Sequence, residues 1–199
     1  MSTSFVYRSP LIYDAVMLAL YGRHAFARCR VVADLIPAGA SILELCCGPG
    51  TLYHRHMRGR GVQYTGLDIN PPFISRLKAM GATGRVWDLQ RDTPLPEADY
   101  VIMQASLYHF LPDPAPVVDR MLAAAGRRVI VAEPIRNLSD SRVPILASLA
   151  RRQTDPGTGA QARRFNEATL DAFFARYAPR VERSFLIPGG REKVYVLAA

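Results

Sequence analysis

The stretch "ILELCCGPGTL", residues 42–52, decides the fold of this chain. Its first four residues are mostly apolar and indicate the end of a buried strand. The segment Gly48-Pro49-Gly50 predicts a tight turn, because glycine tolerates backbone conformations with positive φ. The residues after Gly50 then predict a helix, so a strand leads through a glycine-rich turn into a helix.

Short apolar runs recur along the chain, separated by stretches long enough for a helix. We expect buried strands in five of these runs, at residues 40–45, 62–68, 84–88, 98–104 and 127–134. Strands that alternate with helices are typical of a parallel sheet with helices on both faces. Residues 179–187 and 191–199 flank the turn Pro188-Gly189-Gly190 and predict a β-hairpin. The expected fold class is therefore α/β: a doubly wound, mostly parallel seven-stranded sheet with an antiparallel last strand.

The length of the chain indicates its domain organisation. A chain of 199 residues can bury one sizeable core, so residues 1–199 are expected to form a single domain. Residues 1–38 predict N-terminal capping helices that act as a lid, and residues 39–199 are expected to form the core of the domain. Residues 135–165 interrupt the alternation of strands and helices. We expect them to be either a flap near the carboxyl ends of the strands or a surface loop without a role.

The composition excludes several classes of protein. A hydrophobic fraction of 49% and a charged fraction of 21% are those of an ordinary globular domain, and no run reaches the roughly 20 apolar residues of a membrane span. The first residues do not match the pattern of a secretory signal, so a cytoplasmic protein is expected. The three cysteines do not have the spacing of a disulfide framework or of a zinc site, so no metal is expected.

The net charge of +8 raises the question of an anionic partner. Only two of the 25 basic residues are lysines, and the arginines occur as scattered pairs. This distribution is typical of a solvated surface rather than a binding patch. It therefore argues against nucleic acid as a partner.

The glycine-rich turn does not fit the two phosphate-binding motifs that often follow a first strand. In the dinucleotide motif G-x-G-x-x-G, counted from Gly48 and Gly50, the third glycine falls on Tyr53, and the G-K-[ST] of a P-loop is absent. Acids are present instead: Glu44 lies near the end of the first strand, and Asp68 ends the second. The turn therefore belongs to a different class of site.

From about residue 40 to its end, the chain resembles the class I S-adenosylmethionine-dependent methyltransferases. The first motif of that family is a hydrophobic strand, an Asp or Glu, and then G-x-G-x-G, for which this sequence has residues 44–50, "ELCCGPG". The resemblance implies that S-adenosyl-L-methionine is the cofactor and that the turn lies against its methionine part. The cofactor-binding residues that it implies are Glu44, Cys46, Gly48, Gly50, Asp68, Ile69, Asp88, Leu89 and Gln104.

Two acids in this set have alternative roles. Asp68 is expected to accept hydrogen bonds from both ribose hydroxyls, or else to cap the next helix, a position for which Asn70 is better placed. Asp88 is expected to accept from the adenine amino group while Leu89 donates from its backbone, or else to cap the turn that follows.

Cys46 is a departure, because the family most often has its first glycine at this position. We expect Cys46 to have a negative φ, which tolerates a Cβ. Cys46 and Cys47 are then compact packing residues, and a reactive thiol is the alternative.

Residues 104–109 resemble the loop that lines the acceptor pocket in small-molecule methyltransferases. His109 is the candidate catalytic residue, as a general base whose rate profile rises through a pKa near 6 to 7; a packing histidine is the alternative. A tetrapeptide of the N-P-P-Y type is absent, which argues against nucleic-acid bases as acceptors. The other residues expected in the acceptor pocket are Tyr13, Met17, Tyr108 and Glu133.

The expected function is methyl transfer from S-adenosylmethionine to a small-molecule acceptor by in-line displacement. The alternatives are an RNA-directed methyltransferase, a lipid- or quinone-directed one, and a catalytically inactive protein that binds S-adenosylmethionine. The identity of the acceptor and the methylated atom, O, N, C or S, stay open. The chain is expected to be a monomer or a homodimer.

Overall fold

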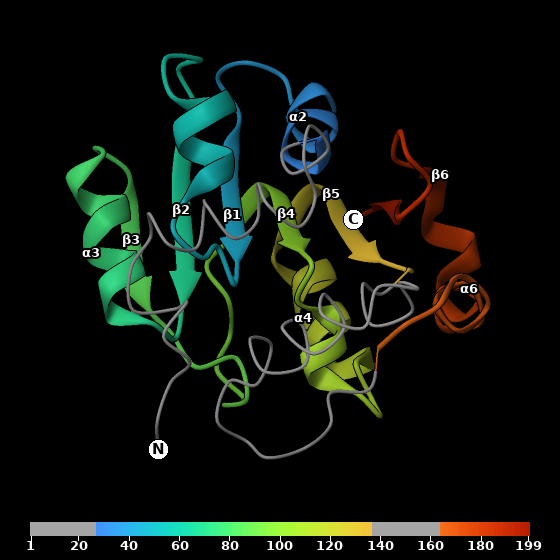
Figure 1. Cartoon of the computed structure of the whole chain (residues 1–199). Helices are drawn as coiled ribbons and strands as arrows, with labels where there is room; N and C mark the ends of the chain where they lie inside the picture. The colour runs from blue at the N-terminus through green and yellow to red at the C-terminus, as the bar shows by residue number, and fades with distance from the viewer. Residues whose placement is uncertain (1–26, 137–163) are drawn as a thin grey trace, which may run out of the picture.

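The computed structural model of the chain describes residues 27–136 and 164–199. Within these residues, seven strands form one sheet in the order β3-β2-β1-β4-β5-β7-β6 (Figure 1). The strands are β1 (Ser41–Leu45), β2 (Gln63–Asp68), β3 (Thr83–Val86), β4 (Ala98–Gln104), β5 (Ala125–Pro134), β6 (Val181–Leu186) and β7 (Glu192–Ala198).

The strand directions confirm the expected fold class. β1 pairs in parallel with β2 and β4, and the parallel pairs β2–β3 and β4–β5 extend the sheet on both sides. β7 is antiparallel to both β5 and β6, between which it lies. The antiparallel last strand arises because Gly189 and Gly190, both with positive φ, let the chain turn back after β6.

Helices and short helical turns connect the strands. The α-helices are α2 (Ala27–Asp34), α3 (Pro71–Ala79), α4 (Ala115–Ala124) and α6 (Glu167–Phe174), and the short segments are η3 (Tyr53–Met57), η4 (Leu107–Phe110) and η6 (Ala175–Arg180). Proline occupies the first turn of α3, where its fixed φ suits a helix and its missing N–H costs no hydrogen bond. A capping box starts α6, since the Asn166 side chain accepts from the Thr169 N–H at 2.8 Å.

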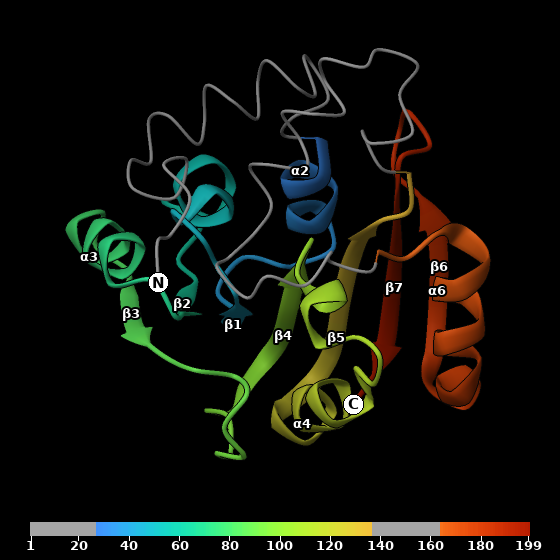
Figure 2. The ribbon, with the colours of Figure 1, turned by 60° about the horizontal axis from the view of Figure 1, so that its bottom comes forward.

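The hydrophobic core lies in two layers, one on each face of the sheet. Alternate residues of β1 point to opposite faces, so Ile42 packs in the layer under α2 and α3, and Leu43 packs in the layer under α4 and α6. Figure 2 shows α2 on one side of the sheet and α4 on the other. The sheet is therefore doubly wound, and its carboxyl edge is left between the two layers for the loops.

Some of the expectations fall on parts of the chain that the structure does not describe. The predicted N-terminal helices are described only from residue 27, as α2, and Tyr13 and Met17 lie outside the described residues. Most of segment 135–165 lies outside them as well, although Phe165 at its end is buried in the core. In the part that is described, the helices are too short or too polar to cross a bilayer.

Candidate functional site

The carboxyl ends of the parallel strands bring most of the predicted site residues to one edge of the sheet. Because β1 to β5 run in the same direction, the segments that follow Leu45, Asp68, Val86 and Gln104 all begin at this edge. The strand order reverses between β1 and β4, which are neighbours although β2 follows β1 in the chain. Open α/β sheets bind their ligands at such a switch point.

The turn after β1 has left-handed backbone at Cys46 (φ 52°), Gly48 (φ 55°) and Gly50 (φ 76°). A Cβ on Gly50 would lie 2.8 Å from the terminal methyl Cδ1 of Leu77 in α3, which would have to shift, and the positive φ itself favours glycine there. A Cβ on Gly48 would meet no atom within 4 Å. Gly48 therefore borders open space, which a ligand that approaches the backbone needs.

Cys46 differs from the expectation of a negative φ, because its φ of 52° lies in the region that favours glycine. The chain turns sharply after β1, and the Cys47 N–H fixes the turn by donating to Leu67 O of β2 at 3.0 Å. The two cysteines pack into different core layers. Burial raises the pKa of Cys46 to about 12 and that of Cys47 well above its usual range. Both thiols stay protonated near neutral pH, which supports their role as packing residues.

Asp68 joins the glycine turn to the start of α3. Its Oδ2 accepts from the Gly48 N–H and its Oδ1 from the Asn70 N–H, each at 2.8 Å. Burial raises the pKa of Asp68, and these two bonds oppose the shift. Asn70 occupies the N-cap position of α3, but its side chain does not bond to the first turn. Each oxygen of Asp68 has a second lone pair, so the carboxylate retains the capacity to accept from a ligand.

Glu44 is enclosed next to this turn and is only 3% exposed. It accepts hydrogen bonds from the Tyr64 hydroxyl and, at 2.6 Å, from Gln104 Nε2. Burial raises the pKa of Glu44 to about 7, although these two bonds and the charge of Arg28 act in the opposite direction. The structure thus brings the predicted residues Glu44 and Gln104 together. Oε1 of Gln104 is buried and has no partner within the described residues, so an acceptor is left at this point.

Glu133, near the end of β5, holds the loop that follows β4. Its Oε2 accepts from the N–H groups of Ser106 and Leu107, both at 3.1 Å. The loop starts with a sharp bend at Ala105, whose φ is 48°. Burial raises the pKa of Glu133 to about 7, and the bonds from the loop backbone oppose the shift. The predicted pocket residue Glu133 therefore lies beneath the loop, where it fixes the backbone.

His109 and Tyr108 are adjacent in η4, with ring centroids 4.0 Å apart. The guanidinium of Arg164 lies 3.4 Å from the centroid of the Tyr108 ring. Desolvation by the surrounding chain, helped by the charge of Arg164, lowers the pKa of His109 to about 4, although the residue as a whole is exposed. This pKa lies below the value of 6 to 7 expected from the sequence. The imidazole is neutral at pH 7, and it is a weaker base than a histidine with an ordinary pKa.

The segment after β3 carries Asp88 and Leu89. Asp88 Oδ1 accepts from the Gln90 N–H at 3.0 Å, which is the turn-capping role given above as the alternative. Leu89 is 7% exposed, and its N–H has no hydrogen-bond partner in the described part of the chain. Ile69 and Val86 are 67% and 54% exposed, and Val86 pairs with Asp68 across the two strands. A free donor thus lies in the same region as two exposed apolar side chains.

A pocket of about 450 Å³ lies between this segment and the loop that carries His109. Residues 89–92 line one side, residues 109–111 and 113 line the other, and α4 contributes Pro116, Val117 and Arg120. It connects the predicted cofactor residue Leu89 with the candidate catalytic residue His109. Across residues 27–136 and 164–199, His, Cys, Asp and Glu side chains do not gather in groups of three or more that could hold a metal ion.

Several residues of the site were not predicted from the sequence. Tyr64 binds Glu44, Arg164 stacks on Tyr108, and Arg120 binds the backbone after β3. A signal existed for Tyr64, because a tyrosine inside a buried strand needs a partner for its hydroxyl. The two arginines had none, since their partners lie far away in the sequence.

The chain is similar to known proteins both in sequence and in fold. The model of a family described as the methyltransferase domain matches residues 21–178. None of the curated protein sequences matches the chain significantly.

Solved structures share the fold at low sequence identity. The magnesium protoporphyrin IX methyltransferase of Synechocystis PCC 6803, with bound SAH, has a TM-score of 0.63 and 16% identity over 96% of this chain and 87% of that chain. The TehB-like SAM-dependent methyltransferase of Corynebacterium glutamicum has a TM-score of 0.62 and 18% identity, over 94% of this chain and 95% of that chain. A Haloferax volcanii complex between the Trm112 methyltransferase activator and a methyltransferase contains a chain with a TM-score of 0.71 and 14% identity. The match covers 100% of this chain and 99% of that chain.

The family model spans most of the chain, and the solved structures share its fold. The chain therefore belongs to the methyltransferase-domain family, the class I enzymes that use S-adenosylmethionine.

Proposed function

We propose that this chain transfers a methyl group from S-adenosylmethionine to a small-molecule acceptor. The observation that carries the proposal is the meeting of Glu44, Gly48 and Asp68 at the switch point between β1 and β4. Gly48 and Asp68 are joined by a hydrogen bond of 2.8 Å, and Glu44 is on the strand that leads into the same turn. Carboxylates and an open glycine backbone at one place suit a ligand with cationic and hydroxyl groups.

The residues of the site fit S-adenosylmethionine in their charge. Burial raises the pKa of Glu44 and Glu133 to about 7 and raises that of Asp68. A cationic ligand beside these groups would stabilise their ionised forms. Glu44, Cys46, Gly48, Gly50 and Gln104 would then hold the methionine part of the cofactor.

The residues also fit the other half of the cofactor. Asp68 would accept from the ribose hydroxyls with the lone pairs that its two backbone bonds leave unused. The exposed side chain of Ile69, the N–H of Leu89 and the carboxylate of Asp88 would hold the adenine ring. An apolar surface beside a free backbone donor suits a flat heterocycle.

Bound S-adenosylmethionine supplies a methyl group on a positively charged sulfur. The protein has to align the acceptor with this group and exclude water. His109, neutral at pH 7, would accept the proton of a hydroxyl acceptor at an imidazole nitrogen, and Glu133 would keep the His109 loop in place through Ser106 and Leu107. An amine acceptor that arrives neutral needs no base, and His109 would then only shape the pocket.

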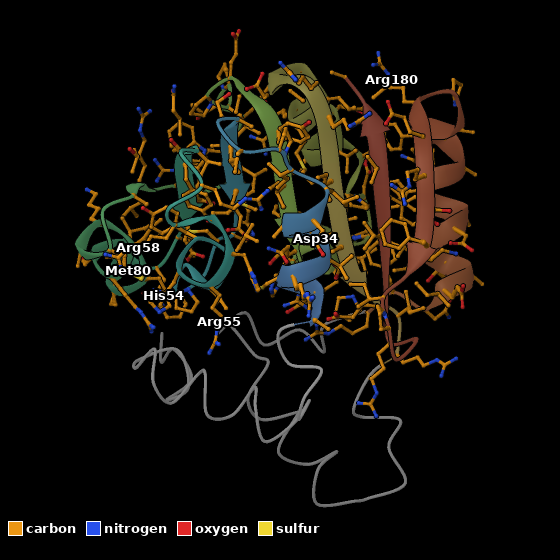
Figure 3. The ribbon with its side chains drawn as sticks, turned by 90° about the horizontal axis from the view of Figure 1, so that it is seen from above. Asp34, His54, Arg55, Arg58, Met80 and Arg180 are labelled. Atoms are coloured by element: carbon orange, nitrogen blue, oxygen red, sulfur yellow. The ribbon has the colours of Figure 1, made fainter. Side chains whose placement is uncertain are left out.

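The charge distribution supports a small acceptor over RNA. Arg127 and Arg128 are paired with acids, at 3.3 Å from Asp99 and 2.7 Å from Glu182. Figure 3 shows Arg58 and Arg180 near opposite ends of the sheet. Within residues 27–136 and 164–199 these arginines lie at separate places, whereas RNA binding favours one continuous basic face. The Synechocystis protein compared above acts on a small molecule, magnesium protoporphyrin IX.

Calorimetric titration tests the proposal directly. We expect S-adenosylmethionine and S-adenosylhomocysteine to bind, and NAD and ATP not to bind. Tight binding of NAD without binding of S-adenosylmethionine would refute it. A panel of hydroxyl, amine and thiol acceptors with methyl-labelled cofactor then tests turnover, and cofactor binding without transfer to any acceptor would favour the inactive alternative.

A further inference from the structure

Arg120 binds the backbone of the segment that connects β3 to β4. Nη2 of its guanidinium donates to Leu89 O at 2.5 Å, and Nη1 donates to Arg91 O at 2.6 Å and to Thr93 O at 3.4 Å. Arg120 lies on α4, on a different connection of the sheet. One side chain therefore ties three carbonyls of residues 89–93 to a helix.

The fold of the segment brings these carbonyls together. Residues 87–97 form neither a strand nor a helix, so the ladders of regular structure do not satisfy their backbone. Asp88 bends the segment by accepting from the Gln90 N–H, and the Thr93 N–H turns back to Arg91 O at 2.9 Å. The carbonyls at 89, 91 and 93 consequently converge on one point.

Packing alone does not hold the segment at this place. The pocket of about 450 Å³ lies between residues 89–92 on one side and residues 109–111 and 113 on the other, so side chains do not fill the gap. Leu89 and Leu95 anchor the segment in the core, and the guanidinium reaches the backbone between them. Arg120 borders this pocket and thus crosses from α4 to the segment.

The geometry uses the shape of the guanidinium more than its charge. Within the described residues Arg120 forms no ion pair, and its guanidinium donates to the neutral carbonyl oxygens of residues 89, 91 and 93. A planar fork with donors on two nitrogens can reach three carbonyls at once, whereas a lysine ammonium is a single point. Arginine and lysine are therefore not equivalent here.

We propose that Arg120 is a positioning residue for the adenine end of the cofactor, because it fixes the backbone that presents Asp88 and the Leu89 N–H. This role rests on the proposed function, in which those two groups hold the adenine ring. Arg120 donates to the carbonyl of Leu89, which belongs to the peptide group next to the one that contains the Leu89 N–H. Loss of the clamp releases the donor from its position and leaves the ribose and methionine contacts in place.

Binding measurements on variants test this role. We expect Arg120→Gln to weaken S-adenosylhomocysteine binding about 10-fold, because hydrogen bonds that order the donor are lost. 5′-Methylthioadenosine, which has the adenine but lacks the amino-acid end, should lose the same factor. Arg120→Lys should fall between wild type and Arg120→Gln. Arg128→Gln, which removes an exposed arginine paired with Glu182 at 2.7 Å, is the matched control and should bind as wild type does.

Amide hydrogen exchange without ligand provides a readout that is independent of cofactor binding. In Arg120→Gln the amides of residues 89–93 should exchange faster while those of β4 keep their protection. Equal exchange together with unchanged affinity in Arg120→Gln would overturn the inference. Weaker binding that Arg128→Gln reproduces would overturn it too. Failure of the wild-type chain to bind S-adenosylhomocysteine would instead refute the proposed function.

Discussion

Asp68→Ala tests the cofactor site most directly, because this carboxylate has a structural and a proposed binding role. In the free protein its two oxygens accept from Gly48 and Asn70 at 2.8 Å each. A hydrogen bond to a charged group contributes about 1.5–3 kcal/mol, and partial exposure and relaxation of the turn reduce the sum, so we expect the free energy of unfolding to fall by about 2–4 kcal/mol. Without the carboxylate, the N–H groups of Gly48 and Asn70 would have to donate to water instead.

The same substitution removes the proposed acceptor of two ribose hydroxyls. We expect cofactor binding to weaken by about 2–4 kcal/mol, which is roughly 30- to 1,000-fold in the dissociation constant. Calorimetry with S-adenosylhomocysteine at a temperature below the unfolding transition measures the affinity, and thermal unfolding measures the stability. Asp68→Asn keeps the size of the side chain and one acceptor oxygen, so its affinity for S-adenosylhomocysteine should lie between that of wild type and that of Asp68→Ala.

Asp99→Asn is the matched control for Asp68. Asp99 also accepts two hydrogen bonds, from the Ser41 N–H and hydroxyl, both at 2.9 Å, but it lies near the start of β4, at the opposite edge of the sheet. We expect Asp99→Asn to lower stability and to leave the affinity for S-adenosylhomocysteine unchanged. The reasoning is refuted if Asp68→Ala binds within about 3-fold of wild type, or if Asp99→Asn weakens binding as much as Asp68→Asn does.

Three further predictions follow from backbone strain and from shifted pKa values. Cys46→Gly should raise the free energy of unfolding by about 1 kcal/mol, because glycine removes the strain of the left-handed backbone, and it should keep the affinity for the cofactor. Cys46→Leu should obstruct cofactor binding. Thermal unfolding measures the stability, and calorimetry measures the affinity. The affinity for S-adenosylmethionine should increase as the pH rises from about 6 to 8, because Glu44 and Glu133, with pKa values of about 7, are neutral below this range and ionised above it. Calorimetry at both pH values should show a smaller gain in affinity for S-adenosylhomocysteine, whose sulfur is uncharged. Equal gains for the two ligands would contradict the charge argument. With a hydroxyl acceptor, His109→Ala should lower the rate by roughly 100-fold, the low end of the range for a positioned base, because a pKa of about 4 makes the imidazole a weak base. The wild-type contribution of His109 should stay constant from about pH 6 to 8, and a rate that rises through about pH 6.5 only when His109 is present would argue against this pKa.

The fold could be predicted because its signals are local. Apolar runs of strand length alternate with segments of helical length, and this alternation leaves a parallel sheet as the solution that buries both kinds of element. The turn at Gly189 and Gly190 likewise predicted the hairpin of β6 and β7. In both cases each element is specified by residues that are close in the sequence.

The candidate site was predictable only where its residues end strands. Glu44 and Asp68 meet because parallel strands end at the same edge, so their positions in the sequence suffice. The low pKa of His109 could not be predicted, because desolvation and the charge of Arg164 depend on a segment remote in sequence. Arg120 was missed for the same reason, since the three carbonyls that it binds converge only in the folded chain.

Backbone strain at the switch point connects the two halves of the site. Cys46 and Ala105 are the first residues after the neighbouring strands β1 and β4, and both have left-handed backbone, with φ of 52° and 48°. A residue with a Cβ loses about 1–2 kcal/mol in this conformation, so the surrounding structure has to enforce it. The Cys47 N–H donates to Leu67 O at 3.0 Å, and the Ala105 N–H donates to Ala132 O at 2.8 Å. Each bend is thus held by the neighbouring outer strand: β2 holds the glycine turn, and β5 holds the His109 loop. The sheet that forms the core therefore also sets the directions in which the proposed cofactor and acceptor loops leave it.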